Sequence, residues 1–195
     1  MPGPEILRDA NALFLAKRFR DAISLYDKIL KNDPGNTEAL NNKGYSLSKI
    51  KDYENAMACY EEALKTNPND KTLLTNKVSS LRKMKKYEEA ERCCNLILGT
   101  SPNDPIVLYH KERILFSLGN YESAASCCDA ILETHPENAE ILFDKAASLA
   151  MIGLGQSLDT LSKAVTISNH LKTKAKNHKA FSKFSSDDRF LKITS

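Results

Sequence analysis

The amino-acid sequence predicts an all-α protein built from stacked helical hairpins, and three observations support this prediction. Prolines, alanines and aromatic residues each recur every 34 residues along most of the chain. The composition, with 42% hydrophobic and 27% charged residues, seven Gly and seven Pro, is typical of a helical globular protein. The three periodic series are Pro34, Pro68, Pro102 and Pro136; Ala22, Ala56, Ala90 and Ala124; and Phe19, Tyr53, Tyr87 and Tyr121.

Each repeat is expected to contain two helices. The alanine series marks the place where two helices cross closely and need a small side chain. The aromatic series fills the space beside the turn between them, and the proline ends the second helix because it cannot continue one. A single hairpin cannot bury its faces alone, so the hairpins must stack. The predicted repeats are residues 3–36, 37–70, 71–104, 105–138 and 139–172.

Residues 169–195 are predicted to cap the array, in a segment that overlaps the last repeat. An apolar stripe at helical spacing predicts one capping helix, and Ser186 and Asp187 are candidate N-caps of a short final helix. This segment holds seven Lys or Arg and two Asp, so it is basic. The stripe consists of Leu171, Ala175, His178, Phe181 and Phe184.

The second repeat resembles the tetratricopeptide repeat, a helix-turn-helix unit of 34 residues. This resemblance implies a right-handed α-solenoid of antiparallel helix-turn-helix repeats with a C-terminal capping helix. The "NNKG" wording, with lysine in one phase of four repeats, is similar to a prokaryotic or archaeal subgroup. The signature positions of the second repeat are Leu40, Gly44, Leu47, Tyr53, Ala56, Tyr60, Ala63 and Pro68.

Glu112 departs from the family pattern, because it stands where the second repeat has Gly44. A carboxylate at a close helix crossing costs free energy unless it is paired or reaches water. We therefore expect the fourth hairpin to be splayed, or Glu112 to reach a lysine or arginine. The five cysteines fall on second helices near the crossing alanine and are expected to pack in the core, not to bind metal or form disulfides.

The sequence contains no catalytic, phosphate-binding or zinc-binding motif, so we expect no enzyme activity, no cofactor and no metal. The apolar run near the N-terminus is interrupted by Arg8, Asp9 and Asn11, so neither a signal peptide nor a membrane span is expected. The predicted location is the cytoplasm.

The resemblance implies an interaction module, adaptor or scaffold that binds a partner in a concave groove lined by the first helices. Asparagine amides can bond both the C=O and N–H of an extended peptide, cations attract carboxylates, and aromatic rings take apolar side chains. The predicted groove residues are Asn11, Asn42, Tyr45, Lys49, Asn76, Arg82, Lys83, Tyr109, His110, Arg113 and Phe116.

Some family members hold a chaperone's C-terminal carboxylate with a clamp of three cations and two asparagines. Here Asn11 and Asn42 match the two asparagine positions, and the three cations are missing because Leu7, Thr72 and Asn76 stand in their places. The expected partner is a protein or peptide, acidic or with a free C-terminus, and a membrane is not expected. Two alternatives stay open: a homo-oligomer formed through Leu7, Phe14 or Leu15, and nucleic-acid binding through residues 169–195. The corresponding clamp positions are Leu7, Asn11, Asn42, Thr72 and Asn76.

Overall fold

The structure, a computed structural model, describes residues 3–153 and 155–195 and contains only helices and turns in these residues. The helices form two compact units, one up to Thr100 and one from Ser101, called here the N-terminal unit and the C-terminal unit. The predicted all-α class is confirmed. The N-terminal unit contains α1 (Gly3–Leu15), α2 (Phe19–Asn32), α3 (Thr37–Lys49), α4 (Tyr53–Thr66), α5 (Lys71–Lys83) and α6 (Tyr87–Thr100).

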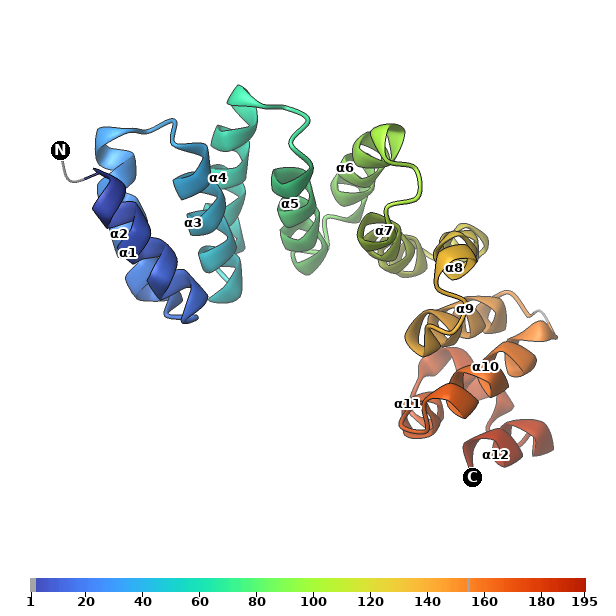
Figure 1. Cartoon of the computed structure of the whole chain (residues 1–195). Coiled ribbons are helices and arrows are strands. Elements are labelled where there is room, and N and C mark those ends of the chain that lie inside the picture. Colours follow the sequence, from blue (N-terminus) through green and yellow to red (C-terminus); the bar gives the residue numbers. More distant parts are fainter. Residues whose placement is uncertain (1–2, 154) are drawn as a thin grey trace. The chain divides into compact units, whose positions relative to one another are not determined.

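The C-terminal unit begins with two further hairpins and ends in three short helical segments (Figure 1). Within each unit the helices of the hairpins pack against one another in order along the chain, as antiparallel neighbours do in a repeat array. The elements are α7 (Pro105–Leu118), α8 (Tyr121–Thr134), α9 (Ala139–Met151), α10 (Gln156–Ile167), α11 (Leu171–Lys176), a 3₁₀ helix η1 (Lys179–Phe184) and α12 (Asp188–Thr194).

Repeated caps explain where the first helices begin. Two residues after each proline of the 34-residue series stands Asn or Asp, whose side chain accepts a hydrogen bond from a backbone N–H of the following first turn. The proline therefore ends one helix and the polar residue starts the next. These N-caps are Asn36, Asp70, Asp104 and Asn138.

The crossing alanines are buried as predicted: all four have 0% exposure. The first-helix residue at this crossing differs from repeat to repeat, and the second-helix residue that packs against it differs with it. Gly44 packs against the fully buried Tyr60, and an added Cβ at Gly44 would lie 2.6 Å from Cε1 of that ring. In the fourth repeat the corresponding pair is Glu112 and Cys128. A large side chain on one helix is therefore matched by a small one on the other.

Glu112 does not splay its hairpin. Its side chain is 1% exposed, and α7 and α8 still pack along each other. The small Cys128 leaves room for it, and the Glu112 charge helps to raise the pKa of Arg113 and of the buried Cys128 thiol. The expected contact of the Glu112 carboxylate with a lysine or arginine stays a prediction.

The prediction of one continuous capping helix is wrong. The segment breaks into α11 and η1, because Asn177 ends the first and His178 starts the second by accepting a hydrogen bond from the Ala180 N–H. Asp187 caps α12 as predicted, and its Oδ1 accepts from the Arg189 and Phe190 N–H groups. We call α11, η1 and α12 together the C-terminal cap.

All five cysteines are free thiols. Four are buried and Cys93 is half-buried. Burial raises the pKa of Cys59, Cys93 and Cys128, which keeps these thiols protonated and unreactive at neutral pH.

Candidate functional site

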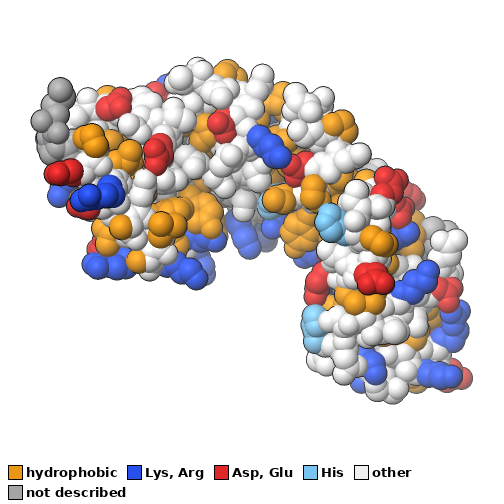
Figure 2. Space-filling model, in the orientation of Figure 1, with side chains coloured by type: hydrophobic (Ala, Val, Ile, Leu, Met, Phe, Trp, Pro, Cys, Tyr) orange, Lys and Arg blue, Asp and Glu red, His pale blue; other side chains and the backbone are white. Residues whose placement is uncertain are grey.

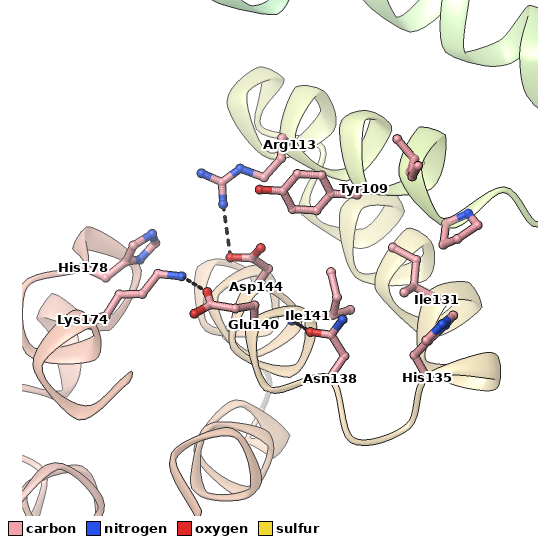
Figure 3. Close-up of a pocket in the computed structure, with 12 residues that line it drawn as sticks. Tyr109, Arg113, Ile131, His135, Asn138, Glu140, Ile141, Asp144, Lys174 and His178 are labelled. Atoms are coloured by element: carbon pink, nitrogen blue, oxygen red, sulfur yellow. Dashed lines mark hydrogen bonds and ion pairs between the residues drawn. The ribbon is translucent and has the colours of Figure 1, made fainter. Parts of the chain in front are cut away.

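The C-terminal unit contains a pocket of about 670 Å³ between α7, α9 and the C-terminal cap. Apolar side chains from the start of α7 line one side, where Ile106 is 61% and Tyr109 36% exposed. Charged side chains line the other side (Figure 3). The pocket therefore combines an apolar surface with fixed charges, which is the usual design of a binding site. Its charged lining residues are Arg113, Glu140, Asp144 and Lys174.

Arg113 and Asp144 form the inner ion pair of this pocket. Arg113 Nη1 donates to Asp144 Oδ1 at 3.1 Å, and the Asp144 side chain is only 6% exposed. Burial raises the pKa of Asp144, while the Arg113 charge acts against that rise. The Arg113 side chain remains 41% exposed, so this arginine holds the buried carboxylate and still reaches solvent.

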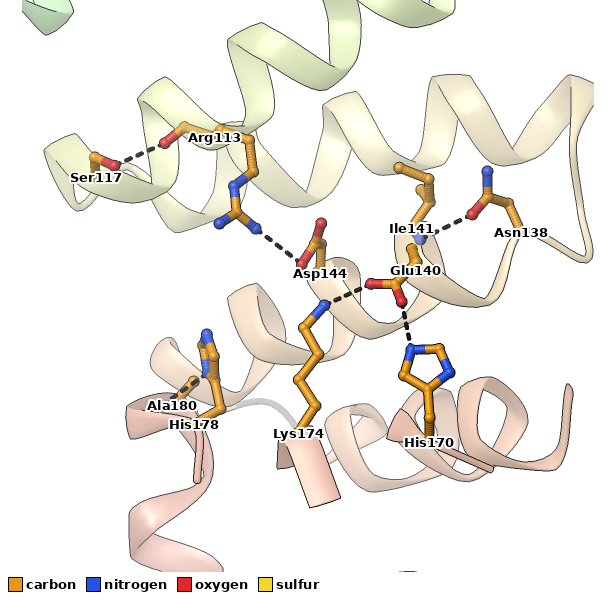
Figure 4. Close-up of polar contacts among 10 residues, drawn as sticks. All are labelled: Arg113, Ser117, Asn138, Glu140, Ile141, Asp144, His170, Lys174, His178 and Ala180. Atoms are coloured by element: carbon orange, nitrogen blue, oxygen red, sulfur yellow. Dashed lines mark hydrogen bonds and ion pairs between the residues drawn. The ribbon is translucent and has the colours of Figure 1, made fainter. Parts of the chain in front are cut away.

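Glu140 joins α9 to the cap. It accepts hydrogen bonds from Lys174 Nζ at 2.5 Å and from His170 Nε2 at 2.8 Å (Figure 4). Partial burial acts to raise the pKa of Glu140, but these two hydrogen bonds outweigh it and hold the pKa below its usual value. Lys174 Nζ also lies 4.3 Å from the centre of the Phe143 ring. The cap wall of the pocket is thus tied to α9.

His178 completes the cap wall from within an aromatic cluster. Its ring lies 6.0 Å from Phe116, 5.5 Å from Phe143 and 5.9 Å from Phe181, measured between centroids. Nδ1 accepts the Ala180 N–H at 3.3 Å, so the neutral ring carries its proton on Nε2. Burial lowers the pKa of His178, and the charges of Lys174, Arg113 and Lys179 lower it further.

We expect acid to weaken the cap through His178. A depressed folded-state pKa means that the neutral ring contributes stability above the ordinary histidine pKa of about 6.5, and that this contribution is lost as the pH falls from there through the folded-state value. Protonation at Nδ1 also removes the N-cap of η1, at a cost of about 1 kcal/mol. Urea unfolding at pH 8 and pH 5.5 measures the loss.

The matched variant for this prediction is His178→Asn, which retains a capping acceptor but does not titrate. Its free energy of unfolding should fall less between the two pH values than that of the wild type. Equal losses in both proteins would show that another group causes the acid sensitivity.

The predicted groove residues divide between the two units. Tyr109 and Arg113 line the pocket of the C-terminal unit. Phe116 does not, because its ring packs against Tyr121 at 5.1 Å and against His178. His110 is half-buried, its ring lies 6.0 Å from Tyr109, and it is not among the lining residues. The predicted groove residues do not include Glu140, Lys174 or His178, nor Asp144, although Asp144 shares the repeat phase of the predicted Asn42, Asn76 and His110.

In the N-terminal unit the asparagines bond one another. Asn42 Nδ2 donates to Asn11 Oδ1 at 3.1 Å, Asn41 Nδ2 donates to Asn42 Oδ1 at 3.2 Å, and Asn76 Nδ2 donates to Asn41 Oδ1 at 2.9 Å. Asn11 Oδ1 also accepts from the Tyr26 hydroxyl at 2.7 Å. These amides therefore join α1, α3 and α5 side by side, and a bound peptide would compete with these bonds.

Tyr45 is also packed by its neighbours. Its ring lies 5.3 Å from Phe14 and 6.4 Å from Phe19, and Lys49 Nζ lies 4.7 Å from its centre. Lys49 and Lys83 are exposed and line a smaller pocket, whereas Arg82 is half-buried and does not line it.

Two alternative functions, homo-oligomer formation and nucleic-acid binding, were left open, and the structure shows where their residues lie. Phe14 packs in the aromatic group with Tyr45, Leu7 is half-buried, and Leu15 is 78% exposed. Several lysines of the cap contact aromatic rings or acceptors of the same unit, as in Lys174 with Phe143 and Lys179, whose Nζ lies 5.8 Å from the centre of the Phe116 ring.

No group of three or more His, Cys, Asp or Glu side chains within residues 3–153 and 155–195 is placed to hold a metal ion. Over the same residues, no helix combines the length and the apolar character needed to cross a membrane.

Comparison with known proteins identifies the class. The tetratricopeptide repeat family model matches residues 37–70. One similar solved structure is MamA, residues 41 to the end, from Desulfovibrio magneticus RS-1, with 15% identity and a TM-score of 0.81 over 86% of this chain and 96% of that one. Another is YrrB, described as a TPR protein with an unusual peptide-binding site, with 22% identity and a TM-score of 0.77 over 89% and 91%. No curated protein matches the chain.

The chain therefore has the fold of tetratricopeptide repeat proteins, and residues 37–70 form one such repeat. The predicted resemblance is confirmed, and the prokaryotic or archaeal subgroup stays a prediction.

Proposed function

We propose that the protein is a non-catalytic interaction module that binds a segment of a partner protein in the pocket of the C-terminal unit. The observation that carries this proposal is the exposed apolar surface of Ile106 and Tyr109 beside the Arg113–Asp144 pair, in one pocket of about 670 Å³. Tetratricopeptide repeats are a fold of stacked hairpins whose surface is available for such binding. YrrB, which shares the fold, is described as having a peptide-binding site.

The bound segment is expected to place an aliphatic side chain on Ile106 and Tyr109, because these exposed side chains lose contact with water on binding. An acidic side chain or free C-terminal carboxylate would then reach the exposed N–H groups of Arg113. Asn138 uses its Oδ1 to cap α9, which leaves its Nδ2 as a donor for a backbone C=O of the segment.

Selection from a displayed peptide library, with free and blocked C-termini, tests this proposal. We expect enriched peptides to bind the Tyr109→Ala, Arg113→Ala variant at least about tenfold more weakly than the wild type, the loss typical of interface hot spots. Arg189→Ala is the control, since Arg189 is 61% exposed and bonds Asp159 outside the pocket. Enrichment that survives the double variant, or no enrichment at all, would contradict the proposal.

A further inference from the structure

The second pocket lies in the N-terminal unit and has about 200 Å³. Side chains of α3, α4 and α5 line it, together with the turn between α3 and α4. Its lining contains three lysines, six hydroxyl-bearing side chains and one asparagine, and none of these ten residues is acidic. The lysines are Lys49, Lys51 and Lys83.

These three lysines differ from others in the same unit. Lys43 pairs with Asp27 at 2.6 Å, and Lys77 pairs with Glu61 at 3.1 Å. No ion pair within the described part of the chain involves Lys49, Lys51 or Lys83. The pocket therefore carries three uncompensated positive charges, which repel one another until an anion binds.

Two of the lining hydroxyl groups, those of Tyr60 and Ser80, belong to buried side chains. Tyr60 is 0% exposed, and burial raises the pKa of Tyr60 to about 12, so its hydroxyl is a proton donor at neutral pH. The neighbouring Ser48 and Ser80 hydroxyls act against that rise, and the Oγ atoms of these two serines bond one another at 2.5 Å. Within the described residues the Tyr60 hydroxyl has no hydrogen bond of good geometry, so an acceptor that enters the pocket would improve its pairing.

Lys51 has an unfavourable backbone conformation. Its φ is 68°, in the left-handed region that favours glycine, and the corresponding positions two and three repeats later are Gly119 and Gly153. Lys17 and Lys85 share this conformation at the same position of the first and third repeats, with φ of 58° and 60°. Figure 2 shows Lys and Arg side chains gathered along the edge of the N-terminal unit at which the turn between α3 and α4 lies in Figure 1.

We propose that this pocket binds the phosphoryl group of a phosphorylated serine or threonine in a partner protein. A phosphate monoester carries close to two negative charges and three acceptor oxygens, which matches three lysines and a set of hydroxyl donors better than a carboxylate does. The small volume fits one such group. The site shares no residue with the pocket of the C-terminal unit, so this proposal does not depend on the function proposed above and is tested separately from it.

The surroundings favour a protein segment over a nucleic acid as the source of the phosphate. Single strands are bound by stacking bases on open aromatic rings, but Phe14, Phe19 and Lys49 already cover Tyr45. Asn76 donates to Asn41 through Nδ2, which leaves its Oδ1 as an acceptor for a backbone N–H of the segment.

Fluorescence anisotropy with the full chain tests the proposal. The probe is a labelled degenerate peptide pool with a central phosphoserine, compared with the same pool unphosphorylated. We expect about tenfold tighter binding of the phosphorylated pool, because charge-assisted hydrogen bonds supply the difference. The triple variant Lys49→Gln, Lys51→Gln, Lys83→Gln should lose this preference. The control is Lys17→Gln, Lys85→Gln, Lys86→Gln, which removes the same charge from exposed residues outside the pocket and should retain it.

Four results would overturn the proposal: no preference for the phosphorylated pool, equal losses in the two triple variants, displacement of the probe by inorganic phosphate as readily as by phosphopeptide, or tighter binding of a single-stranded oligonucleotide. Lys51→Gly provides a second readout. It should raise the melting temperature by relieving the backbone strain, yet weaken phosphopeptide binding. A Lys51→Gly variant that binds as tightly as the wild type would also count against the site.

Discussion

Gly44→Val is expected to destabilise the N-terminal unit by about 3 kcal/mol, because it overpacks a crossing with no free space. A Cβ at this position already lies 2.6 Å from Tyr60 Cε1, and the Tyr60 ring is fully buried, so it cannot move aside without displacing its own neighbours. The gain in helix propensity over glycine is smaller, less than about 1 kcal/mol. Urea unfolding monitored by circular dichroism measures the change.

The companion change Tyr60→Cys should partly rescue this variant. Alone, Tyr60→Cys leaves a cavity and should cost about 3 kcal/mol. Combined with Gly44→Val it reproduces the Val78 and Cys94 pair of the third repeat, where both side chains are buried. We expect the double variant to be more stable than either single variant, with a favourable coupling of at least about 2 kcal/mol. Additive losses would show that the two positions do not share one space.

Most of the fold is predictable from the sequence because the same 34-residue pattern repeats along the chain. Crossing alanines and turn aromatics recur at a fixed period because each hairpin must solve the same packing problem. The Asn and Asp caps after each proline follow from the same period. Position-specific compensation, such as Cys128 making room for Glu112, is harder to foresee, because it depends on a pair of residues on different helices.

The C-terminal cap lies outside the repeat, and the prediction of one continuous capping helix fails there. The apolar stripe correctly selected Phe181 and His178 as residues that pack inward, but a 3.6-residue period cannot show that His178 uses its ring to start a 3₁₀ helix.

The candidate site could be predicted only in part for the same reason. Tyr109 and Arg113 lie in two repeat phases that were predicted to face the groove, and Asp144 shares the phase of Asn42, Asn76 and His110. Lys174 and His178 reach the pocket from the cap, and Lys174 stands 34 residues after its partner Glu140, beyond the end of the proline and alanine series that marks the repeats. Such a contact is visible only in three dimensions.

Phe181→Ala should detach the C-terminal cap and cost about 4 kcal/mol. Phe181 is 1% exposed, and its ring centre lies 5.6 Å from that of Phe143 on α9 and 6.0 Å from that of Phe190 on α12, so it connects two cap segments to the hairpin beneath. Hydrogen exchange should show loss of protection over α11, η1 and α12 before the rest of the unit. Peptide binding in the C-terminal unit should weaken as well, because Lys174 and His178 form one wall of that pocket.

Phe184→Ala is the matched control for this last prediction, because Phe184 is a half-buried phenylalanine of the same 3₁₀ helix. It removes the same atoms from a partly exposed position, so its cost should stay near 1 kcal/mol and peptide binding should be retained. If the two variants lose equal stability, Phe181 does not anchor the cap. If Phe181→Ala loses stability but binds peptides like the wild type, the cap is not a wall of the binding site, and the contacts must come from α7 and α9 alone.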